Sequence, residues 1–329
     1  VADALRAVHV LPDGTVWIAG DHGVLLRVDR GPDGPVLTRV PIPSTPTLAS
    51  VFDDIERSLG ARSPSPSSVE LPGSQFMLSD FTAIAVTSQG DLWVGTETAA
   101  LARWDGVRWS WVVDRDPDAG DVLLAVGPAL WSWGGFGMTM GNSAPAPRIQ
   151  TGGAPASNGP PAQTSSRIRV LARQGDEVWA AGSDGVLLSS RAGAPFAPRP
   201  RLGPDTHDFG ALWLDDAGTA GWIAARDRVY VKQGDGFVPG PAVHGVVADV
   251  FASPGGDPAW VVGEHAQRIV GGVAQIVPIT GWTAPGGAML RFDGERIEAV
   301  HGRSPDDVWM VGAAGLILVH NHPSGSPEP

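Results

Sequence analysis

Short apolar runs alternate with turns rich in Gly, Asp and Pro along the whole chain, and one pattern of residues recurs in them. Its copy at 304–318 (SPDDVWMVGAAGLIL) has a turn, an apolar residue, Trp, two small or apolar residues, Gly and a second apolar run. Repeats of about 40–50 residues built from short strands are typical of a β-propeller. The pattern therefore predicts an all-β fold, a single seven-bladed β-propeller made of four-stranded antiparallel blades. The copies centre on Trp17, Trp93, Trp131, Trp179, Trp222, Trp260 and Trp309.

The first repeat shows how four strands fit into one blade. Apolar runs at 5–11, 15–19, 24–29 and 36–42 are separated by short turns, which is typical of an antiparallel meander. Trp lies on the second strand of each repeat, and we expect it to pack between neighbouring blades. In the last repeat we expect only three strands, so either a segment upstream of Val1 supplies the fourth or this blade has three. The propeller would span 1–320, with a flexible tail at 321–329.

Three long insertions interrupt the repeat, at 43–80, 142–166 and 279–295. The first contains Thr47–Gly60, whose apolar residues recur at helical spacing, so we expect a short helical insertion between blades 1 and 2. The insertions lie at or close to connections between blades, which emerge on one face of the ring. Short turns suffice to connect strands, so insertions on one face predict a face that docks a partner. The expected apolar contacts of this face are Phe52, Ile55, Phe136 and Trp282.

Charge and composition exclude several classes of protein. The formal net charge is −12 and no stripe of basic residues is present, which argues against binding to nucleic acid. The chain has no Cys, which excludes disulfides, thiolate metal sites and Cys nucleophiles. No apolar run is long enough to cross a bilayer. The chain begins at Val1, so we expect an upstream segment, for which a signal peptide is one candidate.

Two segments resemble the repeats of known propeller families. Residues 88–104 (SQGDLWVGTETAALARW) are similar to the repeat of two-component-regulator propellers. Residues 304–318 resemble the repeat of BNR-like and Ycf48-like propellers, which occur in many secreted bacterial proteins and lipoproteins. The resemblance covers the repeats along the whole chain and implies the fold, because these families rarely share a catalytic motif. It also implies a bacterial, extracytoplasmic protein in the periplasm, at the cell surface or secreted.

Two groups of polar residues are candidates for chemistry. Residues 114–121 (DRDPDAGD) place carboxylates at alternate positions before a Gly, and carboxylate oxygens suit calcium; the alternative is a solvated acidic turn. The turns between second and third strands would surround one mouth of the axial funnel, where they could bind a cation, a sugar or a basic peptide, or be ordinary polar turns. The calcium ligands would be Asp114, Asp116, Asp118 and Asp121. The funnel ligands would be Asp21, His22, Glu97, Asp184, Asp227, Glu264 and His265.

These features leave two functions open. The first is a non-catalytic protein-interaction or scaffold propeller that docks a partner on the face bearing the insertions. The second is a carbohydrate-binding or carbohydrate-active propeller, of lyase or hydrolase type, with its site in the axial funnel. The sequence has no nucleophile elbow, P-loop or dinucleotide fingerprint, which favours the first. Convergent charged groups with perturbed pKa values in the funnel would favour the second.

Overall fold

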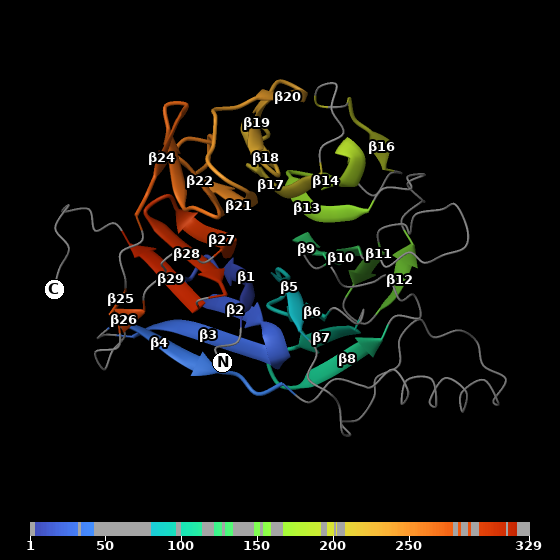
Figure 1. The fold of residues 1–329 in the computed structure, drawn as a ribbon. Helices are drawn as coiled ribbons and strands as arrows, with labels where there is room; N and C mark the ends of the chain where they lie inside the picture. The colour runs from blue at the N-terminus through green and yellow to red at the C-terminus, as the bar shows by residue number, and fades with distance from the viewer. Residues whose placement is uncertain are drawn as a thin grey trace.

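A computed structural model describes most of the chain as antiparallel sheets arranged around a common centre (Figure 1). Within the described residues, no helix is long and apolar enough to span a bilayer. The described residues are 4–31, 34–42, 80–96, 100–113, 122–126, 129–133, 148–151, 154–158, 167–191, 196–200, 202, 208–278, 282–283, 289–290, 296–313 and 315–320.

Six sheets have four strands each, and the strands of a sheet follow one another in chain order. The first three are β1 (Leu5–Val10), β2 (Val16–Gly20), β3 (Val24–Gly31) and β4 (Gly34–Arg39); β5 (Phe81–Val86), β6 (Leu92–Thr96), β7 (Ala100–Trp104) and β8 (Trp109–Val113); and β9 (Val122–Val126), β10 (Ala129–Trp133), β11 (Arg148–Thr151) and β12 (Ala154–Asn158). The other three are β13 (Ile168–Gln174), β14 (Glu177–Gly182), β15 (Leu187–Arg191) and β16 (Ala197–Pro198); β17 (Phe209–Leu214), β18 (Gly221–Ala225), β19 (Arg228–Gln233) and β20 (Gly236–Pro239); and β21 (Val247–Ala252), β22 (Ala259–Gly263), β23 (Gln267–Val270) and β24 (Val273–Ile276).

A further sheet has three strands, and a separate ribbon has two. The strands of the ribbon are β25 (Trp282–Thr283) and β26 (Met289–Leu290), and those of the sheet are β27 (Ile297–Ser304), β28 (Asp307–Gly312) and β29 (Gly315–His320). The first strands of the sheets contact one another in the order β1, β5, β9, β13, β17, β21 and β27, and β27 returns to β1. The ring is therefore closed by the sheets formed from the two ends of the described chain (Figure 1).

The prediction of seven four-stranded blades with a helical insertion is wrong. The sheet of β27, β28 and β29 has three strands, because no described residue follows β29 that could pair with its outer edge. The helices among the described residues are two single 3₁₀ turns, η1 (Asp21–Gly23) and η2 (Ser183–Gly185). Each contains a residue with left-handed backbone angles, which stops a right-handed helix from continuing. The predicted helix at 47–60 lies outside the described residues.

The recurring tryptophans lie at equivalent positions, which confirms that part of the prediction. Each occupies the second strand of its sheet and faces the first strand through antiparallel pairing, as Trp309 does with His301. Trp309 is buried with Val8, Val10 and Ile18 of the neighbouring sheet, so it seals the junction where the ring closes. The second-strand residues are Trp17 in β2, Trp93 in β6, Trp131 in β10, Trp179 in β14, Trp222 in β18, Trp260 in β22 and Trp309 in β28.

A glycine three residues after Trp has a packing reason in several repeats. In the sheet of β13–β16, the carbonyl oxygen of Arg167 accepts a hydrogen bond from the Ser183 N–H at 2.8 Å. This hydrogen bond holds the Arg167 carbonyl against Gly182, where an added Cβ would lie 1.9 Å from the carbonyl oxygen. Any side chain at this position would collide with the backbone, which accounts for the Gly of the repeat pattern. The equivalent glycines are Gly20, Gly182, Gly263 and Gly312.

Candidate functional site

The predicted funnel residues that the structure describes occupy turns between second and third strands. Among them, His22 and Asp184 lie in η1 and η2, where both have left-handed backbone angles. Their backbone N–H groups donate to Asp80 Oδ1 (2.9 Å) and Asp208 Oδ1 (3.2 Å), each just before the first strand of the next sheet. These two turns therefore join neighbouring sheets, and a ligand-binding role for them stays a prediction.

Two other funnel residues make contacts within their own sheets. The Asp21 carboxylate pairs with Arg6 of its own sheet, and Glu264 Oε2 accepts a hydrogen bond from the Val246 N–H at 3.2 Å. Asp227 and His265 are exposed in the β18–β19 and β22–β23 turns.

Several predicted site residues lie outside the described residues. These are Glu97 of the funnel, all four predicted calcium ligands (Asp114, Asp116, Asp118 and Asp121), and the partner contacts Phe52, Ile55 and Phe136. Trp282 lies in β25, and nothing is described of its side chain. In the part of the chain that the structure describes, no three His, Asp or Glu side chains gather in a way that could hold a metal ion.

Titratable side chains with perturbed pKa values lie on the inner strands, and they join successive sheets. The Val300 N–H donates to Asp249 Oδ2 (2.9 Å), which connects β21 to β27. The Val10 N–H donates to His301 Nδ1 (3.1 Å), which connects β27 to β1, and His301 stacks on His9 with ring centroids 5.0 Å apart. Burial lowers the pKa of His9 to about 4, and burial together with the nearby His9 lowers the pKa of His301 to about 3. Both imidazoles are thus neutral near pH 7, as an Nδ1 acceptor requires.

Burial raises the pKa of Asp249 to about 7, although hydrogen bonds from Val300 and Val250 oppose this rise. The folded state therefore binds this proton more tightly than the unfolded chain, in which Asp has its ordinary value of 3.8. The stabilising contribution of the neutral carboxyl is fully present below the unfolded pKa and is lost as the pH rises through about 7.

We expect Asp249→Asn to gain stability relative to the wild type as the pH rises from about 5 to about 8, because the amide cannot ionise. The measurement is the thermal midpoint of both proteins across this range. His9 and His301 change the stability with pH in the opposite direction. Both proteins contain these histidines, so the difference between the two midpoints removes their contribution. Asp235→Asn, a change of an exposed carboxylate, should show no such trend. A constant difference between wild type and Asp249→Asn would contradict a raised pKa.

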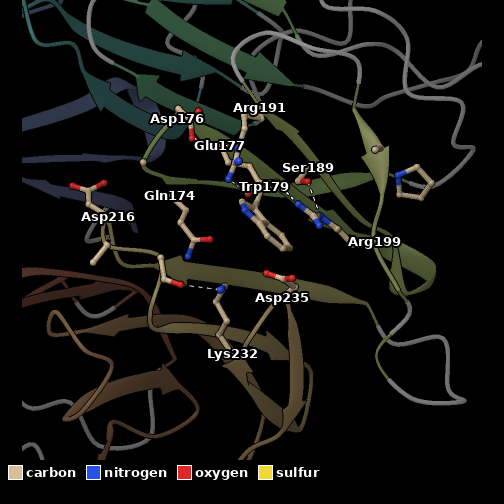
Figure 2. Close-up of a pocket in the computed structure, with 15 residues that line it drawn as sticks. Gln174, Asp176, Glu177, Trp179, Ser189, Arg191, Arg199, Asp216, Lys232 and Asp235 are labelled. Atoms are coloured by element: carbon tan, nitrogen blue, oxygen red, sulfur yellow. Dashed lines mark hydrogen bonds and ion pairs between the residues drawn. The ribbon is translucent and has the colours of Figure 1, made fainter.

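An open cleft of about 730 Å³ lies between the sheets of β13–β16 and β17–β20 (Figure 2). Its walls come from the β13–β14 and β17–β18 turns, from the β19–β20 hairpin and from the outer strands β15 and β16. Turns of this kind emerge on the face opposite to the connections between blades, so the cleft lies on the face away from the predicted docking face. The side chains that line the cleft include those of Gln174, Glu177, Trp179, Arg199, Lys232 and Asp235.

Buried N–H groups without a partner mark the wall of this cleft. Trp179 is 2% exposed, and neither its Nε1 nor the Nε2 of Gln174 has a hydrogen-bond partner. An unpaired buried donor is costly, so a native structure rarely leaves one without a reason. At two other junctions the equivalent indole N–H does have a partner, since Trp222 donates to the Gly256 carbonyl (2.9 Å) and Trp260 to the Pro305 carbonyl (2.8 Å).

At the Trp179 junction the equivalent carbonyl has another partner, and the indole N–H of Trp93 likewise lacks a partner among the described residues. The turn that faces Trp179 contains Gly218. Gly218 is equivalent to Gly256, because the Gly218 N–H donates to the Asp215 carbonyl and the Gly256 N–H donates to the Ser253 carbonyl in the same way. The Gly218 carbonyl is taken by the Lys232 ammonium (2.9 Å), which also donates to the Gly234 carbonyl (2.7 Å). Lys232 is the single lysine of a chain with 23 Lys and Arg in all. Its rarity singles Lys232 out in the sequence, although nothing in the sequence shows which carbonyls it contacts.

The charged groups of the cleft are largely paired inside and exposed at the rim. Arg199 lies over the Trp179 ring, 4.8 Å from its centroid, donates to Ser189 Oγ (2.7 Å) and pairs with Glu177. Burial raises the pKa of Glu177, but hydrogen bonds from Ser189 and Arg199 outweigh it and keep the pKa below its ordinary value. Carboxylates of the rim stay open to solvent, with the Asp176 side chain 66% exposed and that of Asp216 76% exposed. Asp176 pairs with Arg191 and Asp216 with Arg173. The interior of the cleft thus offers neutral donors, and the exposed Asp235 is the remaining carboxylate of its rim.

Comparison with known proteins supports the fold. A family model described as two component regulator propeller matches residues 76–98, which include β5 and β6. Comparison with the curated proteins finds no match. Among solved structures, the chain is similar to YCF48 bound to D1 peptide, with a TM-score of 0.64 and 11% identity over 99% of this chain and 94% of that one.

Two further structures have the same fold. The WD40 β-propeller domain of Doa1 has a TM-score of 0.65 and 10% identity over 98% of this chain and 95% of that one. The extracellular domain of the putative hybrid two component system BT4673 from B. thetaiotaomicron has a TM-score of 0.63 and 11% identity. The match covers 97% of this chain but 38% of that protein. The chain is therefore a β-propeller similar in fold to YCF48 and to the extracellular domain of a two component system.

Proposed function

We propose that this protein is a non-catalytic interaction propeller that docks a protein partner outside the cytoplasm. The observation that carries the proposal is the exposure of four apolar side chains on the outer strands of two sheets. Val273 and Ile276 of β24 are 58% and 47% exposed, and Val36 and Leu37 of β4 are 53% and 55% exposed. Large apolar side chains that stay exposed on outer strands are available for contact with a protein partner.

The position of these strands supports the same proposal. The sheets of β24 and β4 stand on either side of the three-stranded sheet, whose outermost strand is β29 (Figure 1). The strands β24, β29 and β4 are named here the outer arc. β24 and β4 also lead along the chain into the insertions at 279–295 and 43–80, which are predicted to lie on the docking face.

The comparisons favour a protein partner and a location outside the cytoplasm. One similar structure is a propeller bound to a peptide, and another is an extracellular domain. A carbohydrate site in the axial funnel has less support. The inner-strand groups with perturbed pKa values, Asp249 and His301, accept backbone hydrogen bonds from the next sheet, which gives them a structural role.

Charged substitutions on the outer arc test the proposal. We expect the double substitution Val273→Glu with Ile276→Glu to weaken co-purification of the partner by at least about tenfold, because a carboxylate would have to be buried against the partner. Val107→Glu is the matched control, since Val107 is 84% exposed in the β7–β8 turn, away from the arc. Equal recovery of the partner by all three proteins would contradict docking on the outer arc.

A further inference from the structure

We propose that the cleft between the sheets of β13–β16 and β17–β20 is a second binding site, which takes a main-chain segment of a protein. A carbonyl oxygen of the bound segment would accept hydrogen bonds from Trp179 Nε1 and Gln174 Nε2. The inference rests on the proposed role of the ring in binding proteins, but it uses other residues on another part of the ring.

The chemistry of the ligand follows from what the same indole binds elsewhere in the ring. Trp222 and Trp260 donate to main-chain carbonyls in the turn of the next sheet, at 2.9 and 2.8 Å. At Trp179 the equivalent carbonyl, that of Gly218, is held by Lys232. The geometry of the repeat therefore presents an indole N–H suited to a main-chain carbonyl, and the described chain supplies none.

The amide of Gln174 adds a second donor at the same wall (Figure 2). This side chain lies against Gly218, where an added Cβ would be 3.7 Å from Gln174 Cδ. Both nitrogens are shielded from solvent, so the flexible Gln174 side chain must turn aside as a ligand enters. Two N–H groups on one wall match the two lone pairs of a carbonyl oxygen.

The charges of the cleft select the flanking side chain of the ligand. Arg199 is committed to Glu177, and Lys232 to two carbonyls, so neither is a free site for an anion. At the rim, Asp176 pairs with Arg191 and Asp216 with Arg173, and the exposed Asp235 is the remaining carboxylate. A segment with an Arg or Lys next to the bound carbonyl complements this carboxylate.

The state of the Trp179 ring argues against a sugar. Sugars bind to proteins by stacking on an open aromatic face. Here Arg199 covers one face of the ring at 4.8 Å, and Phe237 packs edge-on with its centroid 6.0 Å away. The buried indole offers its N–H group and no open face.

The test selects peptides from a phage-displayed random library on the wild-type protein, in the presence of excess Gln174→Met protein as a competitor. Peptides that survive must depend on the Gln174 amide. Their binding is then followed on the ¹⁵N-labelled protein through the indole N–H signals, and that of Trp179 is identified by its loss in Trp179→Phe. Methyl glucoside and acetate are tested in the same way.

We expect the surviving peptides to be rich in Arg or Lys and to shift the Trp179 indole signal while those of Trp222 and Trp260 stay in place. Gln174→Met and Trp179→Phe should each weaken binding at least about fivefold, because each leaves the carbonyl of the peptide short of a donor. Trp260→Phe, which removes an N–H that already has a partner, should bind the peptide as the wild type does.

Three results would overturn the inference: no peptide survives the competition, the Trp179 signal does not move, or it moves with methyl glucoside or acetate alone. None of these outcomes bears on the outer arc. Loss of partner binding by the Val273 and Ile276 variant with no peptide in the cleft would leave the proposed function intact and remove the cleft from it.

Discussion

Trp309→Ala is expected to lower the free energy of unfolding by about 3–5 kcal/mol, because it removes a buried indole and leaves a cavity that the surrounding strands cannot fill. Trp309 is 6% exposed and packs with Val8, Val10 and Ile18 of the first sheet. The substitution weakens the junction at which the ring closes. The measurement is the free energy of unfolding of the variant and of the wild type by chemical denaturation.

The comparison with Trp309→Phe separates packing from other effects of the substitution. Phe keeps an aromatic ring at the junction, so this variant should lose clearly less stability than Trp309→Ala. If Trp309→Ala unfolds at the same denaturant concentration as the wild type, the tryptophan does not seal the ring.

Gly182→Ala is expected to have the second largest effect, a loss of about 1–3 kcal/mol or more from overpacking. The backbone of Gly182 is extended, with φ −171°, so an alanine is not excluded by its backbone angles. What excludes it is the Arg167 carbonyl oxygen, 1.9 Å from the position of the added Cβ. The carbonyl is held there by its hydrogen bond from Ser183 and cannot yield without breaking that bond.

Gly236→Ala is the matched control. Gly236 begins β20, and nothing lies within 4 Å of the position of an added Cβ. Alanine there should change the free energy of unfolding by less than about 1 kcal/mol. The measurement is the thermal midpoint of both variants. Equal midpoints would contradict a clash between a side chain at position 182 and the Arg167 carbonyl.

The repeat could be predicted from the sequence because each copy solves the same packing problem. The second strand is covered by neighbouring sheets on both faces and needs apolar residues with a large ring, as at Trp260, and Gly where a carbonyl crosses, as at Gly263. These demands are local, so they leave a pattern of fixed spacing. The three strands of the last repeat could also be expected from the sequence, whereas the sequence left open which segment would pair with the outer edge of β29.

The cleft could not be predicted from the sequence. At this junction the Gly218 carbonyl accepts a hydrogen bond from Lys232, and Trp179 has no partner among the described residues. These three residues are far apart in the sequence, and in the repeat pattern Trp179 looks like every other tryptophan. The roles of Asp249 and His301 were hidden for the same reason, since each acts on the backbone of the next sheet.

The most direct test of the proposed function is site-specific photo-crosslinking in the cells that make the protein. A photoreactive phenylalanine analogue replaces Val273 on the outer arc in one protein and Val107 in a control. We predict that position 273 yields one abundant crosslinked protein, and that the same product is absent from position 107. No crosslinked protein at position 273, or the same products at both positions, would contradict docking of a protein partner on the outer arc.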